Sequence, residues 1–141
     1  MEFMKEALKI AEKSGKDLPV GAVIIKDGKI LAKAHNKKEL KNDVTAHAEI
    51  LAIQSAQRKL KTRFLNDCEI YITLEPCPMC AWAILNAGIP KVYFGAYDTM
   101  YGALGSAADL RTFLHSKTAV TGGILEEECS KLLKDYFRKI R

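Results

Sequence analysis

The chain has 141 residues, of which 48% are hydrophobic and 28% charged, and a formal net charge of +5. This length fits a single domain of residues 1–141, and the apolar content excludes an intrinsically disordered chain. The longest uncharged run, residues 76–90, is too short to cross a bilayer, and the charged N-terminus does not fit a signal peptide. We therefore expect a cytoplasmic protein with no membrane partner, whose modest basic excess permits an RNA partner without requiring one.

The first part of the chain predicts a helix, a hairpin and a second helix. Over residues 2–14, apolar side chains recur on one helix face, and Gly15 is a stop signal. Residues 20–25 and 29–34 are β-prone runs separated by an Asp-Gly hairpin turn. Residues 46–60 predict a helix that is apolar at its start and basic toward its end, so it should be buried at its start and exposed at its end.

The second part of the chain alternates strands and helices. We expect strands at residues 70–74, 91–96 and 118–121, and helices at residues 78–87 and 126–140, with a loop-rich stretch before the last strand. A hairpin followed by such alternation is typical of a mixed sheet covered by helices on both faces. The predicted fold class is α/β, as a three-layer α/β/α sandwich with a mixed five-stranded sheet.

Two short motifs carry the chemistry, and each lies where a predicted helix begins. Thr-Ala-His-Ala-Glu occupies residues 45–49, and Glu-Pro-Cys-Pro-Met-Cys occupies residues 75–80. Together they provide one imidazole and two thiols, from His47, Cys77 and Cys80. Three protein ligands are what a catalytic zinc uses, because its fourth position stays open. The predicted cofactor is therefore one Zn²⁺ per subunit, at the edge of the sheet where open α/β folds place their sites.

Glu49 follows His47 by two residues, a spacing that sends two helical side chains to different sides. It is therefore a poor second ligand but a suitable general acid and base beside the metal. Glu49 is the predicted catalytic residue.

The separate motifs also have other interpretations. Cys-x-x-Cys alone fits a redox pair, which would leave His47 and Glu49 unexplained, or half of a structural zinc site. A structural zinc site needs a fourth ligand, for which only four residues remain: His35, His115, Cys68 and Cys129. We expect these histidines at the surface or hydrogen-bonded, and these cysteines as buried free thiols. The joint pattern is far more specific, because His-x-Glu followed by Pro-Cys-x-x-Cys is the signature of zinc-dependent nucleobase deaminases.

Beyond this signature, the chain resembles the bacterial tRNA-specific adenosine deaminases of the cytidine deaminase superfamily. The similarity runs from about Met4 to Arg141 and includes both zinc segments, a Gly-Ala-Leu-Gly-Ser stretch at residues 102–106 and Tyr-Phe-Arg at residues 136–138. The resemblance implies a cytidine deaminase-like fold and hydrolytic conversion of adenosine to inosine at the wobble position of a tRNA anticodon. It implies that zinc is held by His47, Cys77 and Cys80.

The resemblance also implies which residues contact the substrate: Asn36, Ala48, Val20 and Leu74. For Asn36, a structural role in the turn after the hairpin is the alternative. Two other functions stay open. One is deamination of a free nucleobase or nucleoside, guanine or cytosine/cytidine, because the motif determines the reaction and not the base. The other is a non-catalytic zinc-stabilised RNA-binding module, against which the carboxylate of Glu49 argues.

Two helices suggest partners. The helix at residues 78–87 is apolar all round and includes Trp82, so one face could meet a second copy in a homodimer, as the resemblance also implies. The last helix has an apolar stripe for docking, formed by Leu132, Leu133, Tyr136, Phe137 and Ile140. A separate basic row could contact the phosphates of a tRNA anticodon stem-loop: Lys131, Lys134, Arg138 and Arg141. A solvated face is the alternative for this row.

Overall fold

The predicted hairpin forms one end of the central sheet. In the computed structural model, which describes residues 2–140, β1 (Gly21–Lys26) pairs antiparallel with β2 (Lys29–His35). Asp27 and Gly28 connect the two strands with φ values of 52° and 74°, the left-handed backbone that a two-residue hairpin turn requires. The first and last residues of the predicted domain, Met1 and Arg141, lie outside the described part of the chain.

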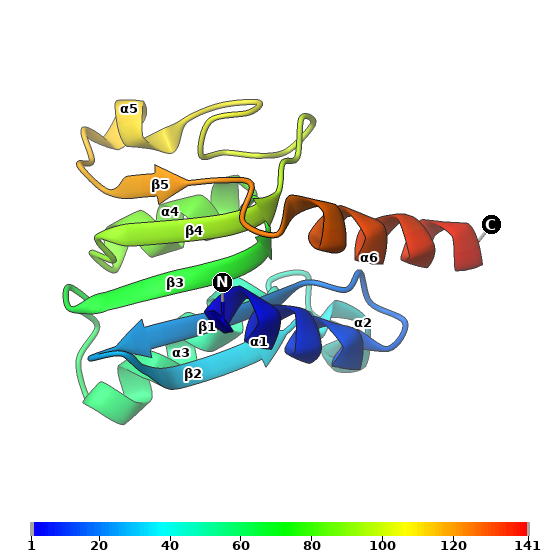
Figure 1. Ribbon diagram of the computed structural model, residues 1–141. Coiled ribbons are helices and arrows are strands. Elements are labelled where there is room, and N and C mark those ends of the chain that lie inside the picture. Colours follow the sequence, from blue (N-terminus) through cyan, green and yellow to red (C-terminus); the bar gives the residue numbers. More distant parts are fainter. Residues whose placement is uncertain (1, 141) are drawn as a thin grey trace.

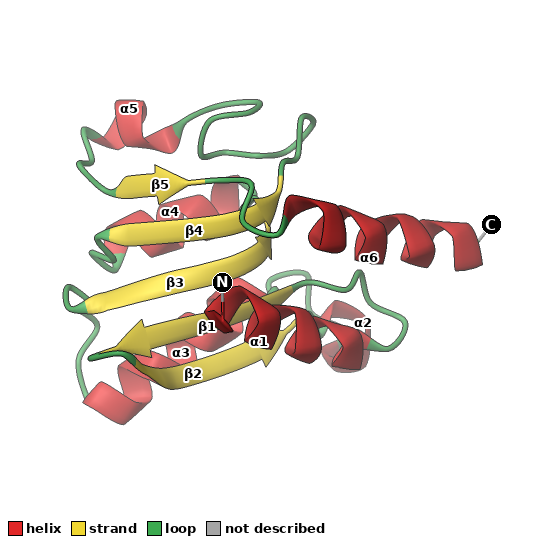
Figure 2. Cartoon of the chain, viewed as in Figure 1, coloured by secondary structure: helices red, strands yellow, loops and turns green. Residues whose placement is uncertain are grey.

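The sheet is mixed, as predicted. Its other strands are β3 (Cys68–Leu74), β4 (Lys91–Ala96) and β5 (Ala119–Thr121), and the strand order is β2-β1-β3-β4-β5 (Figure 2). β1 runs antiparallel to β3, whereas β3, β4 and β5 run parallel to one another. The carboxyl ends of the parallel strands therefore meet at one edge of the sheet, which is the edge where the sequence predicts the site.

Helices cover both faces of the sheet, so the three-layer sandwich is confirmed (Figure 1). α3 (Ala48–Leu60) and α4 (Pro78–Asn86) lie behind the sheet in this view, and α1 (Glu2–Ala11) and α6 (Glu126–Lys139) lie in front. Within residues 2–140, no helix has the length and apolar content needed to span a membrane.

β1 shows how the alternation along one strand serves both layers. Ala22 and Ile24 belong to the larger core under α3 and α4, while Val23 and Ile25 belong to a smaller core with α1 and α6. All four side chains are buried, because a strand in the middle of such a sandwich has no solvent-facing side.

Three short elements complete the chain. A 3₁₀ turn (Glu12–Ser14) follows α1, and α5 (Leu110–Leu114) lies within the loop-rich stretch before β5. α2 (Lys38–Lys41) was not predicted. Its first turn is held by the buried carboxylate of Asp17, whose two oxygens both lie 3.1 Å from the backbone N–H of Glu39. This contact joins distant segments, so local sequence patterns do not reveal it.

The predicted docking of the last helix is right only for its first half. Cys129 is buried and Leu132, Leu133 and Tyr136 are half-buried. Phe137 and Ile140, which the apolar stripe also placed against the domain, are 47% and 62% exposed. Figure 1 shows the reason: α6 starts beside β4 and runs past the end of that strand, so its last turns have no sheet beneath them.

Candidate active site

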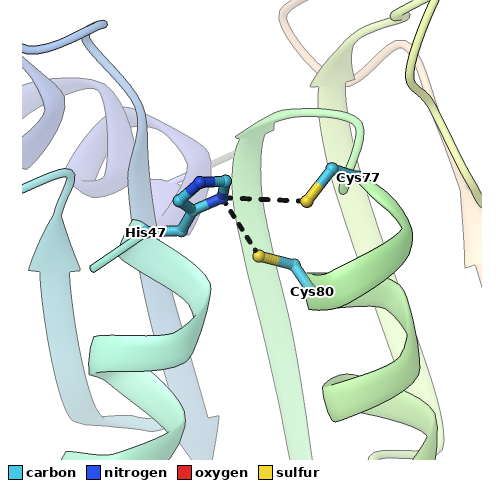
Figure 3. A group of neighbouring side chains, drawn as sticks. All are labelled: His47, Cys77 and Cys80. Atoms are coloured by element: carbon cyan, nitrogen blue, oxygen red, sulfur yellow. Dashed lines mark hydrogen bonds between the residues drawn. The ribbon is translucent and has the colours of Figure 1, made fainter. Parts of the chain in front are cut away.

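The structure brings the three predicted metal ligands together at the starts of two helices. His47 is the residue immediately before α3, and Cys77 is the residue immediately before α4, whose first position is Pro78. Proline suits this position because its missing N–H would have no partner in the first turn. Cys80 lies one turn into α4, so both sulfurs face the imidazole of His47 (Figure 3). Free N–H groups at a helix start favour thiolates, which is the form that binds metals.

The ligand atoms have the spacing of a tetrahedral site. Nδ1 of His47 lies 3.4 Å from Sγ of Cys80 and 3.7 Å from Sγ of Cys77. All three atoms lie within 4.8 Å of one another. Metal–sulfur bonds of about 2.3 Å and metal–nitrogen bonds of about 2.0 Å at the tetrahedral angle separate nitrogen and sulfur by about 3.5 Å. The group can therefore hold a metal ion, and its donor set and spacing are consistent with zinc.

The two thiols are strongly coupled. Hydrogen bonds from Cys80 and from His47 lower the pKa of Cys77 to about 4. The same contact with Cys77, together with burial, raises the pKa of Cys80. Two adjacent thiolates in a buried position repel each other, so the pair keeps one proton unless a cation compensates the charge. A divalent cation favours both thiolates and displaces that proton, so metal binding is expected to be coupled to proton release.

Glu49 lies beside this group without belonging to it. In the described part of the chain, the cluster of potential ligand atoms contains His47, Cys77 and Cys80 but not Glu49. The Glu49 side chain is buried on the first turn of α3 and lines the same cavity as His47 and Cys77. Burial raises the pKa of Glu49 to about 7. A carboxyl group whose pKa lies near neutrality can both accept and donate protons at physiological pH.

A cavity of about 410 Å³ opens in front of these residues. Three of the predicted substrate contacts line it: Val20, Asn36 and Leu74. Ala48 does not line the cavity, and its backbone N–H donates to Oδ1 of Asn36 at 2.8 Å. Any contribution of Ala48 to binding would therefore act through Asn36.

The side chain of Asn36 connects two parts of the cavity wall. Its Nδ2 donates to the backbone carbonyl of Leu18 at 3.0 Å, while its Oδ1 accepts from Ala48. Both oxygen and nitrogen therefore have backbone partners, and Asn36 also lines the cavity. This arrangement supports the structural alternative for Asn36 and still permits a substrate contact.

Several cavity residues were missed by the sequence analysis. They come from loops, from α2 and from α6: Lys16, Asp17, Lys38, Glu39, Glu75, Asp98, Tyr101 and Tyr136. Glu75 had the clearest signal, because it is a charged residue between a buried strand and a metal motif. Tyr136 had none, because its hydroxyl reaches the site through a 2.9 Å hydrogen bond to the carbonyl of Lys16, 120 residues away in the sequence.

The remaining histidines and cysteines lie outside this group. Cys68 and Cys129 are buried free thiols, as predicted. His115 is exposed, and His35 makes a hydrogen bond of 3.0 Å to the carbonyl of Asn36. None of them is close enough to complete a structural site of four ligands within residues 2–140.

Comparison with known sequences identifies close relatives. The chain matches the MafB19-like deaminase family over residues 1–141. The tRNA-specific adenosine deaminase of Bacillus subtilis is 42% identical over 99% of this chain and 89% of its own length. That of Aquifex aeolicus is 43% identical over 99% of this chain and 94% of its own length.

Solved structures agree on the fold. A structure from a study of A-to-I editing by tRNA:A34 deaminases at the wobble position of transfer RNA has a TM-score of 0.86 and 39% identity. It covers 94% of this chain and 99% of its own. A guanine deaminase from Nitrosomonas europaea has a TM-score of 0.82 and 25% identity, over 94% of this chain and 81% of its own.

Proposed function

This chain belongs to the tRNA-specific adenosine deaminases, and we propose that it converts adenosine to inosine at the wobble position of a tRNA anticodon. The single observation that carries the reaction is the His47, Cys77 and Cys80 group beside the buried Glu49, at a cavity open to a substrate. The relatives' substrate supports the choice of tRNA.

The ligand group supports zinc as the cofactor, held by His47, Cys77 and Cys80. Zinc bound there would supply a water molecule that is activated as a nucleophile near neutral pH. The residues also suit zinc in number, because three protein ligands leave the fourth position of a tetrahedral ion for the reaction.

Glu49 is proposed to move the protons. Hydrolytic deamination adds one water to adenosine and releases one ammonia, so the ring carbon C6 gains an oxygen and loses the amine. Glu49 would accept a proton from the attacking water and deliver it to ring N1. It would then accept the proton of the hydroxyl group formed on C6 and deliver it to the amine, which leaves as ammonia. Its position on the cavity wall and its pKa of about 7 support a role for Glu49 both as proton acceptor and as proton donor.

The shape of the site supports a substrate in which the target base is unstacked from its neighbours. A base inside a duplex cannot reach a recess at the edge of a sheet, whereas a base in an anticodon loop is already unpaired. Lys16 and Lys38 line the cavity and add positive charge where the phosphates flanking a flipped nucleotide would lie.

Ammonia release tests the proposal against its two rivals. The zinc-loaded protein is assayed on an anticodon stem-loop with adenosine at the wobble position, and on free guanine, cytosine, cytidine and adenosine. We expect ammonia and inosine from the stem-loop alone. Release from guanine or cytidine alone would indicate a free-base or nucleoside deaminase, which the similarity to a guanine deaminase makes a specific rival. RNA binding without any ammonia release would indicate a non-catalytic module.

A homodimer and a cytoplasmic location are also proposed. Trp82 on the outer side of α4 is 51% exposed and, with Ile50 and Ala83, lines a surface hollow between α3 and α4. A large exposed aromatic side chain in such a hollow favours an interface with a second copy. A tRNA substrate places the reaction where tRNA is processed, which supports the cytoplasm.

A further inference from the structure

Glu75 is a buried carboxylate that no metal ligand contacts. It follows β3 and precedes Cys77 by two residues, and its side chain is 2% exposed. Its Oε1 accepts hydrogen bonds from the backbone N–H of Asp98 at 3.1 Å and from the hydroxyl of Ser106. Its Oε2 accepts from the backbone N–H groups of Leu104 and Ser106 at 3.3 and 3.0 Å. Both oxygens therefore meet donors from a single loop, residues 97–109.

The loop is shaped around this carboxylate. A Cβ atom on Gly102 would lie 2.4 Å from Cδ of Glu75, so only glycine allows the loop to pass this close. The next residue, Ala103, donates its N–H to the carbonyl of Pro76 at 2.8 Å. Loop and metal motif are thus joined through Glu75 and Pro76, immediately before the first cysteine ligand.

The loop brings two side chains to the cavity that the metal motif cannot supply. Asp98 and Tyr101 line the cavity opposite α3. Asp98 also accepts hydrogen bonds from the N–H groups of Met100 and Tyr101, at 3.1 and 2.9 Å, so the two residues move together. The N–H of Asp98 is one of the groups that Glu75 holds. The Glu75 carboxylate is therefore the side chain that connects this wall to the segment before Cys77, beside the backbone bond from Ala103 to Pro76.

We propose that Glu75 is a positioning residue for the substrate: it holds Asp98 and Tyr101 at the distance from the metal ligands that the nucleotide requires. The inference rests on the proposed deaminase function, because it assumes that a nucleotide occupies the cavity. Glu75 itself does not exchange protons with the substrate in this proposal. It acts through the loop, so its loss should weaken substrate binding more than the chemical step.

The test compares Glu75→Gln with the unchanged protein. Glutamine keeps the size of the side chain but replaces one acceptor oxygen by an NH₂ group, so at least one backbone N–H of the loop loses its partner. We expect zinc to stay at about one per chain, and KM for the anticodon stem-loop to rise about tenfold while kcat changes less than about threefold. Amide hydrogen exchange at Asp98, Leu104 and Ser106 should become about tenfold faster. Ser106→Ala, which removes one bond and keeps Glu75, should shift KM in the same direction by less.

Asp109→Asn is the matched control. Asp109 is a carboxylate in the same loop, but it does not line the cavity, and it forms an ion pair of 2.7 Å with Arg111. Asp109→Asn should leave KM unchanged. Faster amide exchange in Glu75→Gln with an unchanged KM would show that the hydrogen bonds of Glu75 only stabilise the loop, and would overturn the proposal. Unchanged amide exchange in Glu75→Gln would also overturn it. If the unchanged protein fails to deaminate the stem-loop, the proposed function is wrong. The exchange measurement still shows in that case whether Glu75 holds the loop of residues 97–109.

Discussion

Among single residues, His47 and Glu49 lie two positions apart at the start of α3, and we propose different roles for them. His47 precedes α3, so its ring points toward the cysteines, while Glu49 lies within the first turn and faces the cavity. Burial raises the pKa of Glu49 to about 7, which would be a cost in a purely structural position. A buried carboxyl group next to a metal ligand set is better explained by proton transfer than by stability.

Glu49→Ala should therefore retain zinc and the fold but lose activity. The loss of a general acid and base typically lowers kcat by about 10² to 10⁴. Zinc per chain and inosine formation are measured on the same preparation, with Cys68→Ala as a control that alters a buried side chain away from the site. Loss of zinc from Glu49→Ala would mean that Glu49 is a ligand and that its assigned role is wrong.

At the scale of elements, we propose that a metal ion bound by the His47, Cys77 and Cys80 group stabilises the relative position of α3 and α4. Each contributes a ligand at its N-terminal end, His47 from α3 and Cys77 from α4. Because the ligand atoms lie within 4.8 Å of one another, a bound ion links the two helix starts across the edge of the sheet.

Replacing His47 or Cys77 by alanine should release zinc and lower the melting temperature, because binding energy for the folded site also stabilises the fold. Chelation of zinc from the unchanged protein should lower the melting temperature in the same way. Thermal unfolding with and without a chelator measures both effects. Cys129→Ala, which removes a buried thiol from the other layer, should keep its response to the chelator. A melting temperature that does not respond to chelation would contradict this prediction.

α6 carries the basic row that the sequence analysis proposed as an RNA contact. Its C-terminal half runs past β4, its basic side chains Lys134 and Arg138 are exposed, and Tyr136 reaches the cavity wall. The predicted basic row also includes Arg141, which lies outside the described residues. Lys134 and Arg138 therefore lie on the same helix that contributes Tyr136 to the cavity wall.

Replacing Lys134 and Arg138 together by glutamine should weaken binding of an anticodon stem-loop and leave zinc unchanged. Each lost phosphate contact should flatten the slope of log affinity against log salt by about one unit. Affinity is measured over a range of salt concentrations. Arg58 and Lys61 at the far end of α3 provide the matched control, because the same change of charge there lies away from the cavity. An equal loss of affinity in both pairs would indicate only a general charge effect.

At the scale of the whole molecule, the exposed side of α4 bears on whether the protein is a monomer or a homodimer. The sandwich buries one side of α1 and of α3 but leaves Trp82 of α4 half-exposed in a hollow that apolar side chains, such as Ile50 and Ala83, share with polar ones. An apolar helix that the monomer covers on one side only suits a second subunit.

Sedimentation at micromolar concentration should therefore show a species of twice the 15.7 kDa chain mass. Trp82→Lys should shift the protein toward the monomer, because a buried unpaired charge at an interface is strongly unfavourable. Ile30→Lys, at an exposed apolar position on the edge strand β2, should leave the dimer intact. Observation of the 15.7 kDa species alone in the unchanged protein would contradict the dimer.

The sequence by itself predicted the five strands and the longer helices, and it identified the candidate ligand group. The hairpin, the strands and the longer helices could be predicted because their sequence signals are local. These signals are an Asp-Gly turn, alternation along strands and apolar faces along helices. His47, Cys77 and Cys80 were readable because each lies at the start of a predicted helix, and parallel strands deliver such starts to one edge of a sheet.

Tertiary structure alone decided what surrounds that group. The carboxylate of Asp17 holds α2, Glu75 holds the loop that carries Asp98, and the hydroxyl of Tyr136 reaches Lys16. Each contact joins residues 22 to 120 positions apart, so it leaves no periodicity or spacing in the sequence. The exposure of Phe137 and Ile140 has the same cause, because an apolar stripe shows that a helix can dock but not where the supporting strand ends.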